Sequence, residues 1–491
     1  MKILLVVANA KKWPLQIPDC EVVSARKYLT EPVFSRLSGV RVFNLMYPCR
    51  YQSQGYYVSL LAEARGHRPV PNITTLRDLH TPAMVKMTDA AIHEVVQKSL
   101  TGIKSDRFEL SIYFGRNLAK RYERLCRELF TRFHAHFLRA VFVRNREEWT
   151  LQNISPISIN EIPKSHHDFV EEAASNYFAR AGYRQKKLQS FRYSIAILHN
   201  PDARDSPSNP AALRKFIRAG QKLDLDVQLI TREDFGRLSE FDALFIRETT
   251  NVNNHTFRFA RYAEADGLVV IDDPQSIIRC ANKVFLAELL DHQRIATPRT
   301  MIVHKDNVDL IHHSLGLPCV LKQPDSAFSV GVKKIETASD LMTVATEMLE
   351  KSELIIAQEY LPTDFDWRVG ILDGKVIFVC RYYMAKDHWQ IVKRDHEGGK
   401  QEGDADTLNP QEAPDEVLKI ALRAAAPIGR GLYGVDIKQV ENRFYVIEVN
   451  DNPNIDAGLE DALLQDNLYQ HIMTVFLQRI EQKKLVTREP K

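Results

Sequence analysis

The strongest constraint on the fold is a pair of apolar segments near the end of the chain, Val435–Val440 and Phe444–Val449. Three polar residues, 441–443, separate the two segments, and this pattern is typical of a β-hairpin with a short turn. If those three residues form the turn, the pairing register places Asp436 directly opposite Glu448. The sequence therefore predicts two carboxylates side by side on one sheet.

Asp436, Glu448 and Asn450 share one face of the predicted hairpin, because side chains alternate between the two faces of a strand. Two carboxylates and an amide oxygen form a hard-oxygen site suited to Mg²⁺ or Mn²⁺, with coordination left for water and phosphate. The competing interpretation is a half-exposed hairpin whose polar face meets water. Like charges directly opposite each other are unfavourable without a cation between them, which favours the metal site.

The chain as a whole is typical of a globular protein with several domains. A chain of 491 residues is too long to fold around one hydrophobic core, so two to four domains are expected. A net charge of +3 gives no nucleic-acid signature. The six cysteines form no CxxC pair, which argues against a zinc site or a disulfide framework and favours a reducing cytoplasm. The N-terminus is shaped like a first strand rather than a signal sequence, and no apolar run is long enough to span a membrane.

The first part of the chain predicts a small α/β unit followed by a long amphipathic helix. Segments Ile3–Val7 and Val40–Leu45 are typical of buried strands, and Tyr56–Arg65 is typical of a helix. Apolar residues then recur at helical spacing from Phe114 to Phe137. The remaining faces of this predicted helix are basic and carry Arg116, Lys120, Arg121, Arg124, Arg127, Arg132 and Arg139.

Two interpretations of this basic face stay open. It is either a docking surface for an acidic polymer or protein, or a helix face that is simply solvated. Glu123 and Glu128 dilute the positive charge and favour the second interpretation.

A parallel sheet is predicted for the segment that begins at Tyr193, where short apolar strands alternate with helices. No GxGxxG motif follows any of these strands, so a dinucleotide-binding domain is not indicated. Arg247 and Glu248 lie just past the end of one strand, where ligands of open α/β sheets bind. A surface position for the two residues is the alternative.

A lysine in the next segment is a candidate to bind phosphate. Asn282–Lys283 opens a predicted helix, and Lys322 ends the short apolar strand Cys319–Lys322, where its ammonium group can supply a point charge. A loop of small residues, Gln323–Val332, follows and can turn backbone N–H groups toward phosphate oxygens. Alone this is a weak signal, because a lysine at a strand end is usually solvated.

A second hairpin follows the buried strand Leu354–Pro362. Its turn is Asp373-Gly374, which is a strong turn signal. In the simplest register Asp366 lies opposite Arg381, and Arg368 shares their face. A carboxylate and two guanidinium groups in that arrangement are suited to ribose hydroxyls and polyphosphate, whereas the alternative is a structural cross-strand ion pair.

The order of these parts resembles the ATP-grasp superfamily and, most closely, the RimK-like amino-acid ligases. The resemblance extends from about Tyr193 to the C-terminus, and the segment Gly434–Asn454 is its most specific match. It implies ATP held between two lobes, with divalent metal ions, two in number, on Asp436, Glu448 and Asn450. It further implies ATP contacts with Lys283, Lys322, Ser329, Gly331, Glu359, Tyr360, Leu361 and Asp366.

The implied fold class is α/β (α+β) with three domains. Residues 1–190 would form an N-terminal α/β domain like the extra domain of some RimK-family proteins. Residues 191–280 would form a pre-ATP-grasp domain with a parallel sheet, and residues 281–480 the two-lobed ATP-grasp domain.

The implied function is that of an ADP-forming carboxylate–amine ligase of the cytoplasm, acting through an acylphosphate. Arg368 or Arg381 would stabilise the tetrahedral oxyanion. The expected partners are ATP, a carboxylate substrate such as an acidic peptide or protein, and an amino acid such as glutamate, with neither nucleic acid nor membrane. A nucleotide-binding regulator that has lost ligation and an ATP-grasp phosphotransferase are the alternatives.

The sequence departs from the family pattern at two places. The loop has Phe328 and a single glycine, Gly331, where relatives are often richer in glycine. In RimK the stretch after the second strand of the second hairpin contains arginine and asparagine. The corresponding stretch of this chain is His388–Arg394, which reads His-Trp-Gln-Ile-Val-Lys-Arg. Lys393 and Arg394 are therefore candidates to replace the missing groups.

Overall fold

The computed structural model describes residues 2–37, 39–79, 90–145, 148–180, 191–203, 205–325, 331–394 and 400–486. The chain forms two compact units. The first consists of Met1–Ser194 with Glu233–Phe241, and the second of Ile195–Arg232 with Asp242–Lys491. A separate pre-ATP-grasp domain that ends near residue 280 stays a prediction.

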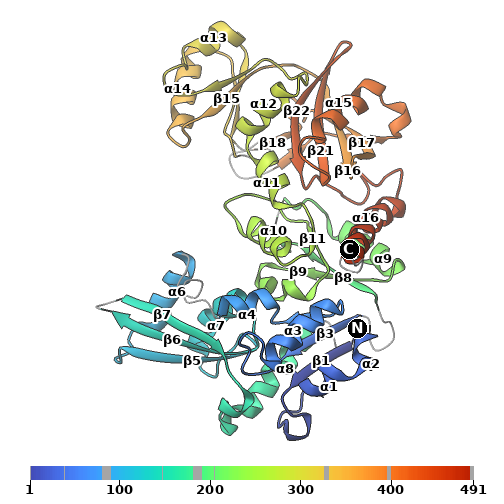
Figure 1. Ribbon diagram of the computed structural model, residues 1–491. Coiled ribbons are helices and arrows are strands. Elements are labelled where there is room, and N and C mark those ends of the chain that lie inside the picture. Colours follow the sequence, from blue (N-terminus) through green and yellow to red (C-terminus); the bar gives the residue numbers. More distant parts are fainter. Residues whose placement is uncertain are drawn as a thin grey trace. The chain divides into compact units, whose positions relative to one another are not determined.

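The first unit begins with a parallel sheet whose strands lie in the order β2-β1-β3-β4. Its two inner strands, β1 and β3 (Figure 1), are buried over almost their whole length, as expected for strands covered on both faces. The strands are β1 (Lys2–Val7), β2 (Glu21–Ser24), β3 (Val40–Asn44) and β4 (Arg68–Val70), and the helices α1 (Ala25–Thr30), α2 (Pro32–Ser35), α3 (Gln54–Ala64), α4 (Ile73–Leu79) and α6 (Ala90–Leu100).

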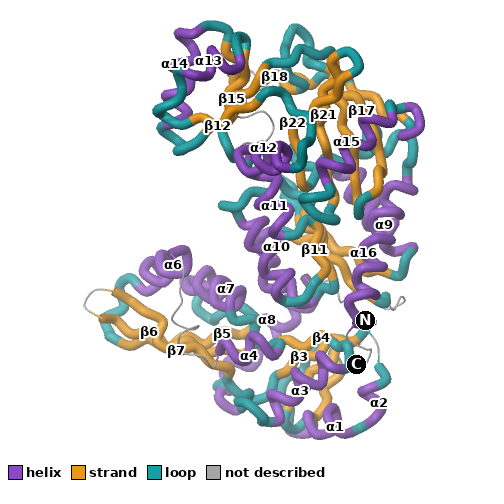
Figure 2. Tube along the Cα trace, turned by 45° about the horizontal axis from the view of Figure 1, so that its top comes forward, coloured by secondary structure: helices purple, strands orange, loops and turns teal. Residues whose placement is uncertain are grey.

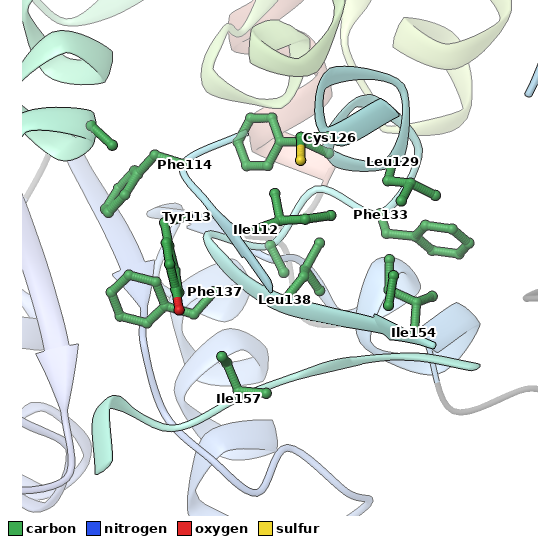
Figure 3. Packing of buried hydrophobic residues seen from close by; sticks show 14 of the residues in the cluster. Ile112, Tyr113, Phe114, Cys126, Leu129, Phe133, Phe137, Leu138, Ile154 and Ile157 are labelled. Atoms are coloured by element: carbon green, nitrogen blue, oxygen red, sulfur yellow. The ribbon is translucent and has the colours of Figure 1, made fainter. Parts of the chain in front are cut away.

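An antiparallel sheet completes the first unit with the order β5-β6-β7. Figure 3 shows side chains of α7, such as Cys126 and Leu129, packed with Ile112 of β5 and Leu138 of β6. These residues belong to one buried cluster, so sheet and helix share a core. The elements are β5 (Arg107–Tyr113), α7 (Glu123–Arg132), β6 (Phe137–Asn145), β7 (Glu148–Pro156) and α8 (His167–Arg180).

The long amphipathic helix predicted from Phe114 to Phe137 is wrong in its extent. Only a short 3-10 turn at Lys120–Tyr122 and α7 are helical, because Phe114 and Gly115 adopt left-handed backbone angles with φ of +50° and +76°, and Phe137 begins β6. Phe114 and Phe137 are nevertheless buried in the same cluster as α7. The apolar spacing therefore marked a shared core rather than one continuous helix.

The basic residues of the predicted face are distributed over several elements, and three of them form ion pairs with acidic side chains. The N–O distance is 3.2 Å between Arg116 and Glu172, 3.8 Å between Arg127 and Glu123 within α7, and 3.9 Å between Arg139 and Glu161. Exposed pairs of this kind contribute little to stability, but they reduce the net field that an acidic partner would meet.

The second unit begins with a sheet in the order β11-β10-β8-β9, in which β8, β10 and β11 run parallel. Helices α9 and α16 pack together through Phe216 and Tyr469, whose ring centroids are 4.7 Å apart. The elements are β8 (Tyr193–Leu198), α9 (Pro210–Lys222), β9 (Leu225–Ile230), β10 (Ala243–Ile246), α10 (His255–Ala265), β11 (Val269–Ile271), α11 (Pro274–Ala281) and α16 (Asp466–Val486).

Two antiparallel sheets with separate hydrophobic clusters follow in the second unit, in the orders β12-β15-β13-β14 and β20-β17-β16-β21-β22 (Figure 2). We call them the first-lobe sheet and the second-lobe sheet. The elements are α12 (Lys283–His292), β12 (Thr300–Val303), α13 (Leu310–Leu315), β13 (Cys319–Lys322), β14 (Val332–Ile335), α14 (Ala338–Leu349), β15 (Ile355–Glu359), β16 (Phe365–Leu372), β17 (Lys375–Tyr383), β20 (Ala405–Leu408), α15 (Asp415–Ala425), β21 (Leu432–Val440) and β22 (Arg443–Asp451).

The predicted α/β class is confirmed, because parallel and antiparallel sheets alternate with helices along the chain. Within the described residues, no helix is both long and apolar enough to cross a bilayer.

Two buried histidines make the stability of the first unit depend on pH. His134 and His136 are at most 2% exposed, and the His136 ring lies 4.9 Å from the ring of Phe43. Burial lowers the pKa of His134 to about 4 and that of His136 below its usual 6.5. The pKa of each histidine is lower in the folded protein than in the unfolded chain, so the folded state is fully stable only where the imidazole is neutral in both states, above the unfolded-state pKa of about 6.5. As the pH falls from about 6.5 toward 4, the unfolded chain binds protons more readily than the folded protein, and stability is lost.

We predict that His134 lowers the free energy of unfolding by about 3 kcal/mol over that interval, at ~1.4 kcal/mol for each pKa unit, and that His136 changes it in the same direction. Urea denaturation of the full chain at pH 7.5 and at pH 4 measures the change. His136→Phe should reduce the pH dependence. If the free energy of unfolding changed equally with pH in the parent and in His136→Phe, protonation of His136 would not be coupled to unfolding.

Candidate active site

The hairpin of β21 and β22 places Asp436 opposite Glu448, as predicted, but by a different route. Its turn has two residues, Glu441 and Asn442, rather than three, so the pairing near the turn is one residue out of the predicted register. A β-bulge at Ile447 adds the missing residue and restores the expected register at Asp436. The two departures cancel, which is why the predicted pair of carboxylates is confirmed.

A row of charged side chains crosses the second-lobe sheet at this point. Arg368 of β16 is the cross-strand neighbour of Asp436, which in turn neighbours Glu448. Arg368 donates to Asp436 through both Nε and Nη2, with 2.9 Å between Nη2 and Oδ2. Asn450 Nδ2 donates to the same Oδ2 at 3.0 Å, which leaves the Asn450 carbonyl oxygen to another partner.

Gly434 makes room for this row. A Cβ at Gly434 would lie 2.7 Å from Pro453 and 3.0 Å from the Arg368 side chain. The absence of a side chain at position 434 therefore lets Arg368 reach across β21 to Asp436.

Lys283 neutralises the second carboxylate from the start of α12, where its Nζ lies 2.9 Å from Glu448 Oε1. Asn282 caps this helix by accepting from the Val284 and Phe285 N–H groups, which fixes where Lys283 emerges. Burial alone would raise the pKa of Glu448, but Lys283 and Lys322 outweigh it and hold that pKa below its usual value. Burial raises the pKa of Asp436, and Arg368 offsets this only in part.

The donor set fits a hard divalent cation that is also bound by phosphate oxygens. Asp436, Glu448 and Asn450 present two carboxylates and one amide oxygen on one face. The site has only two carboxylates, and in the described part of the chain no three or more His, Cys, Asp or Glu side chains are arranged to hold a metal ion by themselves. The protein would therefore supply only part of the coordination sphere of the cation, as is common for Mg²⁺ in phosphate-transferring enzymes.

The predicted pairing of Asp366 with Arg381 is wrong. A bulge at Ile377 shifts the register, so Arg381 lies opposite Trp367 and points to the other face of the sheet. There it forms a two-pronged ion pair with Asp406 at 2.5 and 3.0 Å. Arg368 remains as the arginine of the candidate site, and the geometry removes Arg381 from it.

Lys438 is a site residue that the sequence analysis missed. Its Nζ donates to Asp366 Oδ1 and to Thr363 Oγ1, each at 2.6 Å. Lys438 lies two residues after Asp436 and therefore on the same face of β21. This spacing is the sequence feature that could have identified Lys438 as a site residue. The proposed contact of Asp366 with ribose would therefore have to share the carboxylate with Lys438.

Lys322 of the first-lobe sheet faces the same charges. Its Nζ donates to Gln358 Oε1 at 2.7 Å. Burial lowers the pKa of Lys322 to about 8, although Glu448 acts in the opposite direction, and nearby Lys283 and Lys438 lower it further. Three ammonium groups that repel one another are suited to a polyanion such as a nucleotide phosphate chain.

The remaining predicted nucleotide residues lie just before β14, in the case of Gly331, and at or just after the end of β15, in the case of Glu359, Tyr360 and Leu361. Gly331 has a left-handed φ of +76°, and its carbonyl oxygen accepts from Gln323 N at 3.0 Å. The Glu359 carboxylate binds Arg299, with 3.0 Å between Oε2 and Nε. Lys334 Nζ lies 4.5 Å from the Tyr360 ring centroid, and Leu361 is partly exposed. Ser329 and Phe328 lie outside the described residues, as do the side chains of Lys393 and Arg394, so their roles stay predictions.

A cavity of about 830 Å³ opens beside the charged row. Arg368, Asp436, Glu448 and Asn450 line it together with loops from the parallel-sheet part of the second unit. The lining residues of these loops are 199–201, 203, 205–209 and 249–251, and residues 451–454 and 456 line the cavity after the site residues of β22. A substrate in this cavity would lie directly against the predicted metal and phosphate site.

Arg247 is neither a ligand group nor a surface residue, in contrast to both expectations. It is fully buried and donates to Ser208 Oγ at 3.0 Å and to Asn452 Oδ1 at 2.6 Å. Burial lowers the pKa of Arg247 to about 10, and Asp272 partly opposes this. Arg247 thereby fastens two of the loops that line the cavity.

Comparison with known proteins agrees with this geometry. Residues 25–173 match the RimK-like ATPgrasp N-terminal domain, and residues 280–466 match the RimK-like ATP-grasp domain. A probable alpha-L-glutamate ligase of Vibrio vulnificus strain YJ016 is 28% identical over 233 residues, which cover 47% of this chain and 74% of that protein. A protein of the same description from Marinomonas sp. strain MWYL1 is 25% identical over 293 residues, with 55% and 94% covered.

Among solved structures, the RimK domain protein ATP-grasp from Sphaerobacter thermophilus matches 57% of this chain and 98% of its own, with a TM-score of 0.44 and 14% identity. The two domain matches occur in order along the chain, and the second contains every charged residue of the row described above. The chain therefore belongs to the RimK-like ATP-grasp family of ATP-dependent ligases.

Proposed function

We propose that this protein joins a carboxylate to the amino group of an amino acid, through an acylphosphate formed from ATP. One observation carries the proposal. Lysines from α12 and the first-lobe sheet and a carboxylate–arginine row from the second-lobe sheet meet beside one large cavity. Such a site provides positive charge for phosphates and an arginine for a developing oxyanion, and it needs no nucleophilic side chain.

In the first step a substrate carboxylate oxygen attacks the γ-phosphorus, and the bond to the bridging oxygen breaks to release ADP. Lys322 and Lys283 would bind phosphate oxygens and offset the charge of the transition state. Asp436, Glu448 and Asn450 would hold divalent metal ions, proposed to be two Mg²⁺ or Mn²⁺, which supply further charge neutralisation when bound.

In the second step the amine attacks the acyl carbon, and phosphate leaves as the amide forms. Arg368 lines the cavity, and its Nη1 makes no hydrogen bond with any described residue. This nitrogen is therefore available to stabilise the tetrahedral oxyanion. The other two guanidinium nitrogens are held by Asp436, so the free one has a defined direction.

The amine is proposed to be glutamate, since the two relatives described above are named alpha-L-glutamate ligases. The acceptor is proposed to be a peptide, a protein or a small carboxylate. We assign the reaction to the cytoplasm, where ATP is available and where six free cysteines would stay reduced.

We predict that hydroxylamine intercepts the acylphosphate. With ATP, Mg²⁺ and a panel of amino acids and glutamyl peptides, the protein should form a hydroxamate and release ADP with phosphate. Asp436→Asn and Glu448→Gln should both lose the trapped product, because an amide offers one neutral oxygen where the carboxylate offers two anionic oxygens to the divalent cations. Mass spectrometry of the products and an ADP assay provide the measurement.

Other products would contradict the ligase function. A stable phosphate ester without hydroxamate would indicate a phosphotransferase. ATP binding without turnover on the whole panel would indicate a regulator, and AMP with pyrophosphate would exclude an acylphosphate.

We also predict that ATP binding weakens above pH 8. The lowered pKa of Lys322 means that its ammonium group is protonated below about pH 8 and loses its charge above it. Lys322→Ala should raise the ATP dissociation constant about tenfold at pH 7, since a charge-assisted contact contributes roughly 1.5–3 kcal/mol. This variant should also lose the dependence on pH between 7 and 9.

Titration calorimetry of ATP at pH 7, 8 and 9 makes this measurement. Lys375→Ala is the matched control, because Lys375 is an exposed lysine at the start of β17. A pH dependence that persists in Lys322→Ala would assign the titration to another group.

A further inference from the structure

Arg368 has a second support besides Asp436. Its Cζ lies 5.2 Å from the centroid of the Tyr382 ring, a cation–π contact that restrains the guanidinium plane. Tyr382 is on β17, two strands from Asp436, and only 9% of it is exposed. Asp436 therefore holds two nitrogens of the guanidinium group, and the Tyr382 ring packs against that group.

Tyr382 is itself held by Glu460, to which its hydroxyl group donates a short hydrogen bond. Glu460 is 1% exposed, and its other carboxylate oxygen accepts from the backbone N–H of Asp456 at 2.7 Å. Burial raises the pKa of Tyr382, so the phenol stays a donor throughout the neutral range. Both oxygens of Glu460 are thus occupied, and the direction of its hydrogen bond to Tyr382 is fixed.

Glu460 connects this pair to the wall of the cavity. Asp456 and Leu459 line the cavity, and Asp456 Oδ1 accepts at 2.6 Å from the backbone N–H of Asn209, which also lines the cavity. Thr407 of β20 fixes the same segment by donating to the Leu459 carbonyl at 2.6 Å. A continuous set of contacts therefore leads from the substrate wall through Glu460 and Tyr382 to Arg368.

We propose that Tyr382, anchored by Glu460, is a positioning residue that orients the guanidinium group of Arg368 so that Nη1 faces the oxyanion that develops at the acyl group under attack. The inference rests on the proposed ligase function and extends it. Tyr382 touches no reacting atom in this scheme, because it acts only through Arg368. Loss of the hydroxyl group would let the ring and the guanidinium plane rotate together, and the oxyanion would lose an aligned donor.

The test compares the turnover of four variants in the hydroxylamine assay, with ATP, Mg²⁺ and the glutamyl dipeptide Glu–Glu as the carboxylate probe. Tyr382→Phe keeps the ring and should lower kcat about tenfold, the value of one hydrogen bond to a charged acceptor. Tyr382→Leu also removes the ring and should lower kcat further. In an Arg368→Lys background the Tyr382→Phe change should have less than a twofold effect, because the group that it positions is gone.

Tyr469→Phe is the matched control. The Tyr469 hydroxyl group is also buried and donates to a carboxylate of the same segment, Asp461, at 3.0 Å. Removal of the Tyr469 hydroxyl group deletes a buried hydrogen bond similar to the one that Tyr382 makes, but it leaves the surroundings of Arg368 unchanged. The kcat of this variant should therefore stay within twofold of the parent value, while its Tm falls. Single-turnover trapping with radiolabelled dipeptide keeps the slow Arg368→Lys proteins measurable.

The outcomes separate this inference from the proposed function. A parent-like kcat for Tyr382→Phe would overturn the positioning role, as would an undiminished loss in the Arg368→Lys background. An equal fall of kcat in Tyr469→Phe would also overturn it, since the effect would then be one of general stability. A parent protein that forms no hydroxamate with Glu–Glu or with any carboxylate of the wider panel would overturn the ligase function and the positioning role together.

Discussion

The candidate site depends on the neutralisation of two carboxylates that have left bulk water. Asp436 and Glu448 are cross-strand neighbours, and side by side they would repel each other strongly. Arg368 compensates the first and Lys283 the second, from a neighbouring strand and from the start of a helix. The four side chains thereby form two neighbouring ion pairs, in which each buried carboxylate has a cationic partner of its own.

The two faces of the second-lobe sheet explain how such a polar row is tolerated. Val435, Ile437, Val446 and Val449 alternate with the site residues and are fully buried in the core beneath the sheet. The apolar face thus fixes the strands, while the polar face is free to carry charge. Outer contacts then orient the charges: Glu460 through Tyr382 for Arg368, and Asn282 through its helix cap for Lys283.

Sequence patterns identified most strands, but they failed where backbone irregularities set the register. The pairing of Asp436 with Glu448 was predicted correctly only because a shorter turn and a bulge at Ile447 compensate each other. In the neighbouring hairpin the bulge at Ile377 has no such compensation, and Arg381 moves to the opposite face. Bulges depend on how a strand packs against its neighbours, so a pattern of period two does not reveal them.

By itself the sequence determined the alternation of elements and the family, because residue type and spacing along the chain carry that information. The pair Asp436 and Glu448 and the strand-end Lys322 were identified as candidates from such spacing, and Lys283 from the family resemblance. Only the tertiary structure decided which groups meet: Lys438 with Asp366, Arg247 with Asn452, and Tyr382 with Arg368 and Glu460. These partners come from segments that are remote in sequence or from opposed strands, and only the packing of sheets and loops brings their charges within hydrogen-bonding distance.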